Sequence, residues 1–219
     1  MRLSSPELLV DITGLSDLKT VSLKSDSLRI GALVTHAQIE RDPLVQKHVP
    51  LLAQAVPHIA HAAIRNRGTL GGSLALADPA AEYPACAVAL QSTIIISGAR
   101  GERRVKAEDF FKGLFETDLK DGEILTAVEF PTGGKSVFLE LTRRHGDYAI
   151  IGLAAHESRF VFLCAGPKPV LVKGNTLAEV KAALARITPP ADLYNTSKTK
   201  RHLAGVLLER AWTTLSKPH

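Results

Sequence analysis

A glycine-rich segment in the first third of the chain restricts how the 219 residues can fold around it. Three glycines, at positions 68, 71 and 72, lie within five residues, so side chains do not shield the backbone and its N–H groups can approach an anion closely. Thr69 and Ser73 add hydroxyl donors beside the glycines. The segment therefore predicts a site for an anion such as pyrophosphate.

The spacing of these glycines argues against two common nucleotide sites. It matches neither the G-x-G-x-x-G fingerprint of dinucleotide-binding domains nor a P-loop, whose Lys is also absent. A plain turn between a helix and a strand stays open as the alternative, because a glycine-rich turn by itself is a weak signal of a ligand.

Short strands and helices are predicted ahead of this segment. An apolar run at 8–12 predicts a strand, and alternation of apolar residues across 21–30 predicts a half-buried hairpin. Thr35 and Gln38 have the spacing of a capping box, so a helix is expected to follow Thr35. A second helix is expected over 50–59, since a proline at its first position has a suitable fixed φ.

The pattern changes near residues 120–122, where we expect a boundary between two domains. Before it, we expect an apolar helix over 80–90 and a strand over 93–97. After it, successive strands predict an antiparallel sheet, followed by two helices, the first with a second capping box at Thr176 and Glu179. The strands are expected over 124–130, 137–143, 148–156 and 160–165, and the helices over 177–187 and 203–215.

Charge and cysteine content exclude several classes of function. The net charge of +5 comes from scattered basic residues in a chain that is 5% aromatic, so no nucleic-acid surface is expected. Cys86 and Cys164 lack partners at the spacing of iron–sulfur or zinc sites, so no metal site is expected. No apolar stretch approaches the roughly 20 residues of a membrane span, and the N-terminus lacks the apolar core of a signal peptide, so a cytoplasmic location is expected.

At the glycine-rich segment the sequence resembles a known family. The run Arg65-Asn-Arg-Gly-Thr-Leu-Gly-Gly-Ser-Leu-Ala75, followed by Ala77-Asp-Pro-Ala-Ala-Glu82, is similar to the second flavin-binding motif of the FAD subunits of molybdenum hydroxylases of the xanthine dehydrogenase and carbon monoxide dehydrogenase type. The likeness extends over nearly the whole chain. Further motifs in family order are Leu8-Leu-Val-Asp-Ile12, Asp121-Gly-Glu-Ile-Leu-Thr-Ala-Val-Glu-Phe-Pro131, Arg143-Arg-His-Gly-Asp-Tyr-Ala149 and Arg201-His-Leu-Ala-Gly-Val-Leu-Leu208.

This resemblance implies an α+β fold and an oxidoreductase subunit. A vanillyl-alcohol-oxidase-like FAD-binding domain is expected over 1–118, and a carbon-monoxide-dehydrogenase-flavoprotein-like domain with an antiparallel sheet and helices over 119–219. In the family, electrons pass from molybdopterin in a large subunit through [2Fe–2S] clusters in a small subunit to FAD, and then to NAD⁺, a quinone or oxygen. No catalytic side chain is expected, because the flavin performs the redox chemistry.

The resemblance also implies which residues bind the cofactor. The loop residues expected to hold FAD along its pyrophosphate are Thr69, Leu70, Gly71, Gly72 and Ser73. Glu82 stands where the family has an Asp that contacts FAD. Ile59 and Leu125 match positions that approach the flavin or adenine, although a core role is an equal alternative. Tyr148 resembles a residue beside the isoalloxazine ring, with an ordinary strand tyrosine as the alternative.

Three features depart from the family pattern. Glu140 stands where many relatives have Lys, so an anion replaces a cation near the flavin and disfavours a reduced, negatively charged ring. The hairpin at 156–160 is expected to be shortened. Relatives also carry a first glycine-rich loop ahead of the equivalent of Arg2-Leu3, so we expect an N-terminally truncated chain whose exposed edge favours homo-oligomers.

Two functions are therefore open at this point. The first is a working redox subunit with bound FAD. The second is a truncated family member that keeps the fold and the subunit contacts without FAD, because loss of half a phosphate cradle removes charge-assisted hydrogen bonds worth about 1.5–3 kcal/mol each. His145 is expected to be structural or surface-exposed rather than catalytic, although it lies in a family motif.

Overall fold

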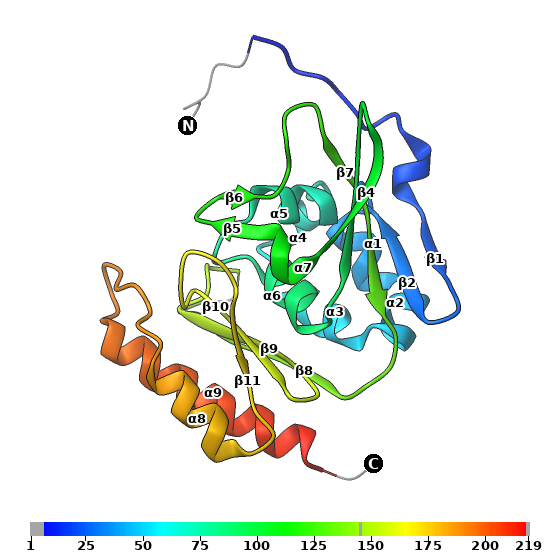
Figure 1. The fold of residues 1–219 in the computed structure, drawn as a ribbon. Helices are drawn as coiled ribbons and strands as arrows, with labels where there is room; N and C mark the ends of the chain where they lie inside the picture. Colours follow the sequence, from blue (N-terminus) through cyan, green and yellow to red (C-terminus); the bar gives the residue numbers. More distant parts are fainter. Residues whose placement is uncertain (1–6, 145, 218–219) are drawn as a thin grey trace.

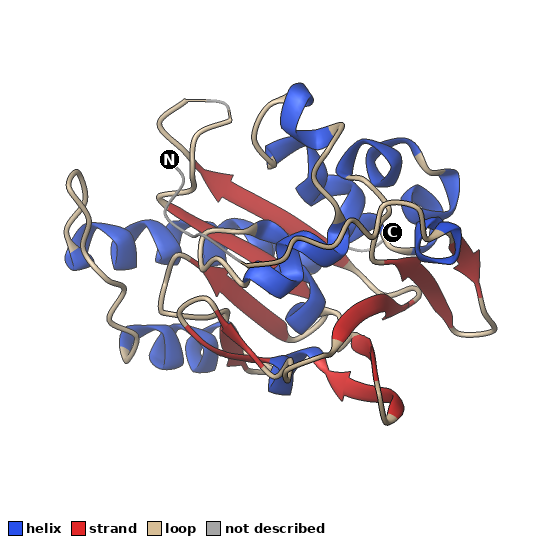
Figure 2. Cartoon of the chain, turned by 90° about the horizontal axis from the view of Figure 1, so that it is seen from above, coloured by secondary structure: helices blue, strands red, loops and turns tan. Residues whose placement is uncertain are grey.

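A computed structural model of the chain describes residues 7–144 and 146–217. It has the predicted α+β fold, in which a five-stranded sheet and a four-stranded sheet, both antiparallel, are each packed against helices (Figure 1). Seen from above, helices lie on both sides of the strands (Figure 2). His145 and the Arg2-Leu3 pair lie outside the described residues.

The five-stranded sheet has the order β1-β2-β7-β3-β4. Its strands are β1 (Val21–Leu23), β2 (Ser27–Gly31), β3 (Thr93–Gly98), β4 (Gly101–Lys106) and β7 (Ile124–Pro131). The hairpin predicted across 21–30 is confirmed, with Val21 opposite Ile30 and Leu23 opposite Leu28. A separate two-stranded ribbon is formed by β5 (Phe111–Gly113) and β6 (Glu116–Thr117).

Strand β7 was expected to open the second sheet, and this is wrong. It lies in the middle of the first sheet, where Phe130 pairs with Leu28 of β2 and Val128 pairs with Ile94 of β3. The chain passes to the second sheet at 132–135, beyond the boundary predicted at 118. Apolar alternation predicts a strand, but it carries no information on which distant strand supplies the backbone hydrogen bonds.

The apolar run at 8–12 does not form the predicted strand. It has no regular structure, and the side chains of Leu8, Leu9 and Val10 are largely exposed. No described strand lies alongside to pair with it, and an unpaired strand gains neither ladder hydrogen bonds nor burial.

The helices between β2 and β3 contact the first sheet on one side and the four-stranded sheet on the other, and they build most of the larger core. They are α1 (His36–Arg41), α2 (Pro43–His48), α3 (Pro50–Ala55), α4 (Ala62–Arg65), α5 (Leu70–Leu76) and α6 (Glu82–Ala89). The capping box at Thr35 and Gln38 is confirmed. The helix expected over 50–59 ends at Ala55 and continues as a 3₁₀ turn, η2 (Val56–His58), because Pro57 has no N–H to extend an α-helix. The other short helices are η1 (Ser16–Lys19) and α7 (Ala107–Phe110).

The four-stranded sheet lies between two layers of helices. Its strands are β8 (Ser136–Leu141), β9 (Ile151–His156), β10 (Arg159–Leu163) and β11 (Val170–Lys173), in the order β11-β10-β9-β8. Helices α3 and α6 cover one face, and the C-terminal helices α8 (Leu177–Ala185) and α9 (Ser197–Leu215) cover the other (Figure 1). All of β10 is therefore buried.

Two details of this part refine the predictions. Only residues 157 and 158 connect β9 to β10, so the hairpin at 156–160 is short. At the second predicted capping box, Thr176 accepts from the Glu179 N–H, but the Glu179 carboxylate accepts from the N–H of Asn175 rather than of Thr176. The helix begins where it was predicted to begin, but the backbone N–H that donates to the Glu179 side chain belongs to Asn175, one residue before the predicted Thr176.

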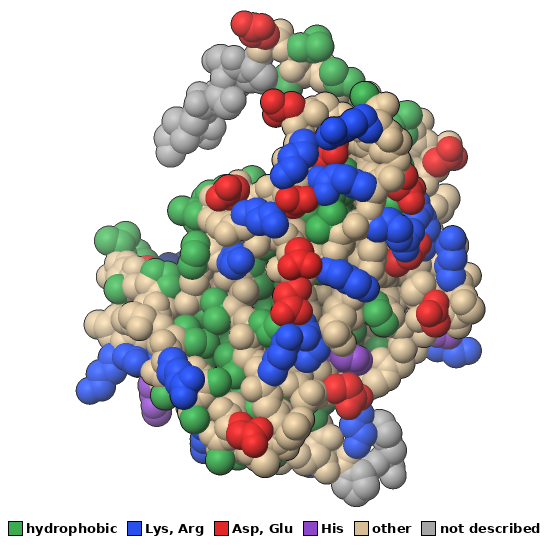
Figure 3. Space-filling view, in the orientation of Figure 1, with side chains coloured by type: hydrophobic (Ala, Val, Ile, Leu, Met, Phe, Trp, Pro, Cys, Tyr) green, Lys and Arg blue, Asp and Glu red, His purple; other side chains and the backbone are tan. Residues whose placement is uncertain are grey.

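Charged side chains of both signs alternate on the face over β4 and β7 (Figure 3). Arg103 bonds both Asp118 and Glu123, and Arg104 pairs with Glu129. These basic residues are thus neutralised locally. Across 7–144 and 146–217, no helix has the length and hydropathy of a membrane span.

Candidate functional site

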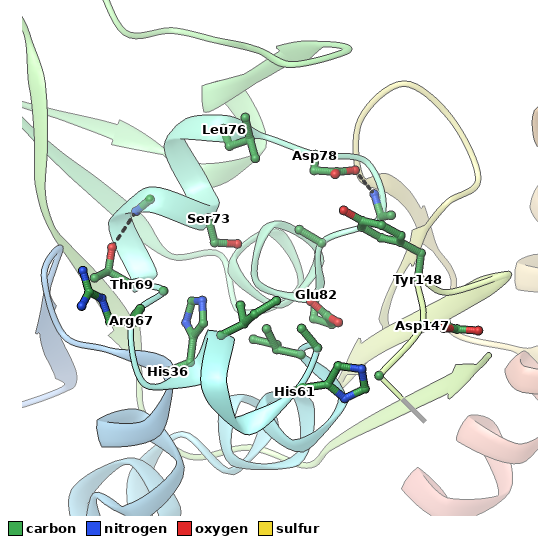
Figure 4. A pocket seen from close by; sticks show the side chains of 18 residues that line it. His36, His61, Arg67, Thr69, Ser73, Leu76, Asp78, Glu82, Asp147 and Tyr148 are labelled. Atoms are coloured by element: carbon green, nitrogen blue, oxygen red, sulfur yellow. Dashed lines mark hydrogen bonds between the residues drawn. The ribbon is translucent and has the colours of Figure 1, made fainter. Parts of the chain in front are cut away.

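A cavity of about 500 Å³ lies where the glycine-rich segment meets four other parts of the chain (Figure 4). Its wall is formed by the start of α1, the turn ahead of α4, the start of α5, the connection to α6 and the loop at 146–148. Cavities of this size commonly hold a small-molecule ligand or part of a cofactor. The site therefore depends on segments that are far apart in sequence.

The three glycines have two different local roles. A Cβ on Gly71 would lie 2.6 Å from the Cβ of Ala32, and a Cβ on Gly68 would lie 2.5 Å from Nε2 of His36. These two glycines are therefore needed for close packing. At Gly72 a Cβ would meet only the Thr69 hydroxyl, at 3.1 Å, so this glycine leaves space at the cavity wall.

The backbone N–H groups of this segment already have protein acceptors. Leu70 donates to the Val34 carbonyl at 3.0 Å and Gly71 donates to the Ala32 carbonyl at 2.8 Å. Gly72 donates to the Thr69 hydroxyl at 3.1 Å, which caps α5. Two of these N–H groups therefore attach α5 to the segment after β2, and the third caps α5 itself. Their approach to an anion stays a prediction.

Six of the nine predicted cofactor residues line the cavity: Ile59, Thr69, Gly72, Ser73, Glu82 and Tyr148. Leu70, Gly71 and Leu125 do not. Leu70 is fully buried in the larger core, and Leu125 packs there on β7, which agrees with the core alternative for Leu125. The contacts of all nine residues with a cofactor stay a prediction.

Arg65 and Arg67 stand two residues apart in the family motif but have different surroundings. Arg65 donates to the carbonyls of Ile59 and Ala60, both at 3.1 Å, and pairs with Glu40 at 3.2 Å. It thereby holds the turn at Ala60, whose φ of 41° is unusual for a residue other than glycine. Arg67 lines the cavity and forms no ion pair with another described residue. The sequence predictions did not include Arg67 among the cofactor residues, although its place in the family motif could have pointed to it.

His36, also missed by those predictions, is a buried polar residue on the cavity wall. It is 5% exposed, and its Nδ1 has no hydrogen-bond partner among the described residues. Burial, followed by the charge of Arg65, lowers the pKa of His36 to about 4, so the ring is neutral at neutral pH. Its ring packs edge-on against Tyr83 at a centroid distance of 5.2 Å. A neutral imidazole can donate one hydrogen bond and accept another.

Two carboxyl groups at this site have raised pKa values. Burial raises the pKa of Glu82 to about 7, opposed by a backbone hydrogen bond and assisted by Asp78. Burial, followed by the nearby Glu82, raises the pKa of Glu140 to about 8. Glu82 lines the cavity itself, whereas Glu140 does not. Neither group joins a metal-binding cluster, since none is found within the described part of the chain.

Residue 146 also shapes the wall of the cavity. Gly146 has a φ of 85°, and a Cβ there would clash with Cε1 of His61. The loop therefore rests directly on the His61 ring, and the exposed side chain of Tyr148 extends over the opening (Figure 4).

The sequence and the structure of the chain are similar to those of several known proteins. Residues 1–133 match the family described as "FAD binding domain in molybdopterin dehydrogenase". The chain is 38% identical over 185 residues to the glyceraldehyde dehydrogenase medium chain of Sulfolobus acidocaldarius, covering 84% of this chain and 61% of that protein. It is 41% identical over 155 residues to the nicotine 6-hydroxylase medium subunit of Paenarthrobacter nicotinovorans, covering 70% of this chain and 55% of that protein.

The solved structures include a similar chain over almost the full length of this one. The quinoline 2-oxidoreductase of Pseudomonas putida 86 superposes with a TM-score of 0.91 at 35% sequence identity, covering 98% of this chain and 84% of that chain. The family match covers the first sheet, the glycine-rich segment and strand β7. The chain therefore belongs to the family of FAD binding domains in molybdopterin dehydrogenases.

Proposed function

We propose that this chain binds FAD in the cavity beside α5 and serves as the electron-transfer subunit of a molybdenum-containing hydroxylase or dehydrogenase. The observation that carries the proposal is the cavity itself. It lies at the glycine-rich motif, and its wall includes residues from both the 59–82 region and the loop at 146–148. Bound FAD supplies a ring that accepts and releases electrons, which no side chain here replaces.

The polar part of the wall fits a pyrophosphate group. Arg67 provides a cation with no ion-pair partner in the described ranges, and the Ser73 hydroxyl makes no hydrogen bond to another described residue. The open side of Gly72 lets a ligand approach the backbone between them. Recognition here depends on side chains, because the N–H groups of α5 are already bonded.

The remaining wall fits an uncharged ring system. Ile59, Ile64 and Leu76 supply apolar surface, and neutral His36 supplies one donor and one acceptor without a charge. Tyr148 extends over the opening, where its ring can cover a bound ligand and exclude water. Together, these residues hold and shield a cofactor, with no nucleophile required.

The partners in this proposal are a molybdopterin-binding large subunit and an iron–sulfur small subunit, with NAD⁺, a quinone or oxygen as acceptor. The support is the match to medium chains of dehydrogenases. The chain spans between about half and two thirds of the length of these relatives, so the activity of the whole enzyme is part of the proposal. The alternative of a fold that binds no FAD is less well supported, because the cavity and its polar groups are present.

Titration of the purified apoprotein with FAD tests the proposal. We expect saturable uptake, read from flavin absorbance and fluorescence, and a loss of affinity of about tenfold or more for Arg67→Ala, since a charge-assisted hydrogen bond contributes about 1.5–3 kcal/mol. The matched control is Arg100→Ala, which removes an exposed Arg from the turn between β3 and β4. A folded protein that takes up no FAD, or equal losses in both variants, contradicts the proposal.

A further inference from the structure

Glu140 is the most unusual charged group of the described residues. Its side chain is 1% exposed, and neither carboxylate oxygen has a hydrogen-bond partner among them. The residue lies on β8 two positions after Phe138, which belongs to the larger core, so both face α3, η2 and α6. An ionised carboxylate in such surroundings is strongly unfavourable, because burial removes its water without replacement.

The groups near Glu140 do not supply a permanent counter-charge. Nδ1 of His58 lies 3.8 Å from Oε2 of Glu140, and His58 packs against Phe138. No Lys or Arg forms an ion pair with Glu140 or Glu82 in the described ranges. The other titratable groups around the two carboxyls lie on the cavity wall or in the core. On the wall they are His61, Asp78 and Asp147, and in the core they are Cys86 on α6 and Cys164 after β10. The one nearby cation among these described groups is Lys200 on α9, which acts on Cys164.

Glu82 connects this buried group to the cavity. It stands at the first position of α6, lines the cavity wall and is close enough to Glu140 to act on it electrostatically. Both carboxyls have pKa values raised chiefly by burial, to about 7 and about 8. Two such groups cannot both ionise at low cost, so they titrate as a pair.

We propose that Glu82 and Glu140 form a buried carboxyl pair that takes up a proton when an anionic cofactor binds in the cavity. The inference rests on the proposed function, since FAD, with its pyrophosphate, is the anion considered. Negative charge arriving beside the cavity makes ionisation of either carboxyl less favourable, so protons move from solvent to the pair as the complex forms. By linkage, binding weakens as the pH rises through the range where the free pair ionises.

The test measures FAD binding by calorimetry between pH 6 and pH 9, in two buffers with different ionisation enthalpies. For the native chain we expect proton uptake on binding and a dissociation constant that rises above pH 7, with a limit of about tenfold per pH unit for one proton. Glu140→Gln, an uncharged isostere of the protonated acid, should reduce both effects, because only Glu82 of the pair can then take up a proton. The control Glu116→Gln changes an exposed Glu on β6 and should keep them. Equal pH dependence in Glu140→Gln and the native chain overturns the proposal.

A second measurement needs no FAD and separates this inference from the proposed function. Because the folded-state pKa values of Glu82 and Glu140 are raised, these two groups hold more protons in the folded protein than in the unfolded one between about pH 4.5 and pH 8. The denaturant midpoint of the native chain should therefore fall relative to that of Glu140→Gln as the pH rises from 5 to 9. If the native midpoint falls relative to that of Glu140→Gln but FAD is not taken up, only the proposed function is contradicted. If the midpoints of the two proteins change with pH in parallel, the proposal of a carboxyl pair is wrong.

Discussion

At the scale of single residues, Arg159 has a role that its sequence position does not suggest. It is 8% exposed, and its guanidinium donates to the carbonyls of Val88 and Ala89 at the end of α6 and to Glu108 at 2.8 Å. Carbonyls in the last turn of a helix have no partner within the helix. Arg159 thus joins β10 to α6, which carries Glu82 at its other end.

Replacing Arg159 should therefore destabilise the protein far more than replacing its neighbour. We expect Arg159→Ala to lower the free energy of unfolding by about 2–4 kcal/mol, since it removes a buried donor from two carbonyls at the end of α6. Lys173 pairs with the same Glu108 at 3.2 Å but is 56% exposed, so Lys173→Ala should cost at most about 1 kcal/mol. Urea denaturation of both variants measures the difference, and equal losses would refute a capping role.

The difference in stability between the native chain and Arg159→Ala should change with pH in a defined direction. The hydrogen bond from Arg159 is the main cause that lowers the pKa of Glu108. A lowered pKa stabilises the fold above the unfolded value and the contribution disappears as the pH falls. The stability gap between the native chain and Arg159→Ala should accordingly narrow in acid.

Residue identities at the cavity were only partly predictable from the sequence. The family motif pointed to Thr69, Gly72 and Ser73, all of which line the cavity. It missed His36, because a His after a capping Thr has no pattern that distinguishes a surface ring from a buried one. Whether the His36 ring is buried, and whether its Nδ1 finds a hydrogen-bond partner, depends on tertiary packing, which the local sequence pattern does not record.

At the scale of elements, α5 is fixed by close backbone contact rather than by side-chain burial alone. Gly71 allows α5 to approach the end of β2, where Ala32 accepts its N–H. Short-range signals predicted where helices begin, as at Thr35 and Thr176. The contact of α5 with β2 joins distant segments, so no local pattern encodes it.

Two glycine-to-alanine changes should therefore have opposite effects. In Gly71→Ala the new methyl would lie 2.6 Å from the Ala32 Cβ and 2.9 Å from its carbonyl oxygen, so we expect a loss of about 1–3 kcal/mol and weaker FAD binding. Gly205 lies inside α9, and a methyl group added there would meet nothing within 4 Å, so Gly205→Ala should stabilise by roughly 0.5–1 kcal/mol. Thermal denaturation checks both, and a neutral Gly71→Ala would contradict the close contact.

At the scale of the whole molecule, the four-stranded sheet connects two hydrophobic cores. Val161 and Leu163 of β10 belong to the larger core, whereas Phe160 and Phe162 belong to the core beneath α8 and α9. Adjacent residues of one strand thus face opposite helical layers. Residues 1–133, which match the family, contribute most of the larger core on one side of this sheet. The C-terminal helices α8 and α9 complete the smaller core on the other side.

This shared sheet predicts cooperative unfolding of both layers. Trp212 of α9, the one tryptophan in the sequence, stacks on Phe160 at a centroid distance of 5.8 Å and reports on the C-terminal layer. Its fluorescence should change at the same denaturant concentration as far-ultraviolet circular dichroism, which reports on the whole fold. Leu207→Ala, at a site 1% exposed, should lower both midpoints together through a loss of about 2–5 kcal/mol. If the Trp212 signal changes first while the ellipticity persists, α8 and α9 detach independently and β10 does not couple the two cores.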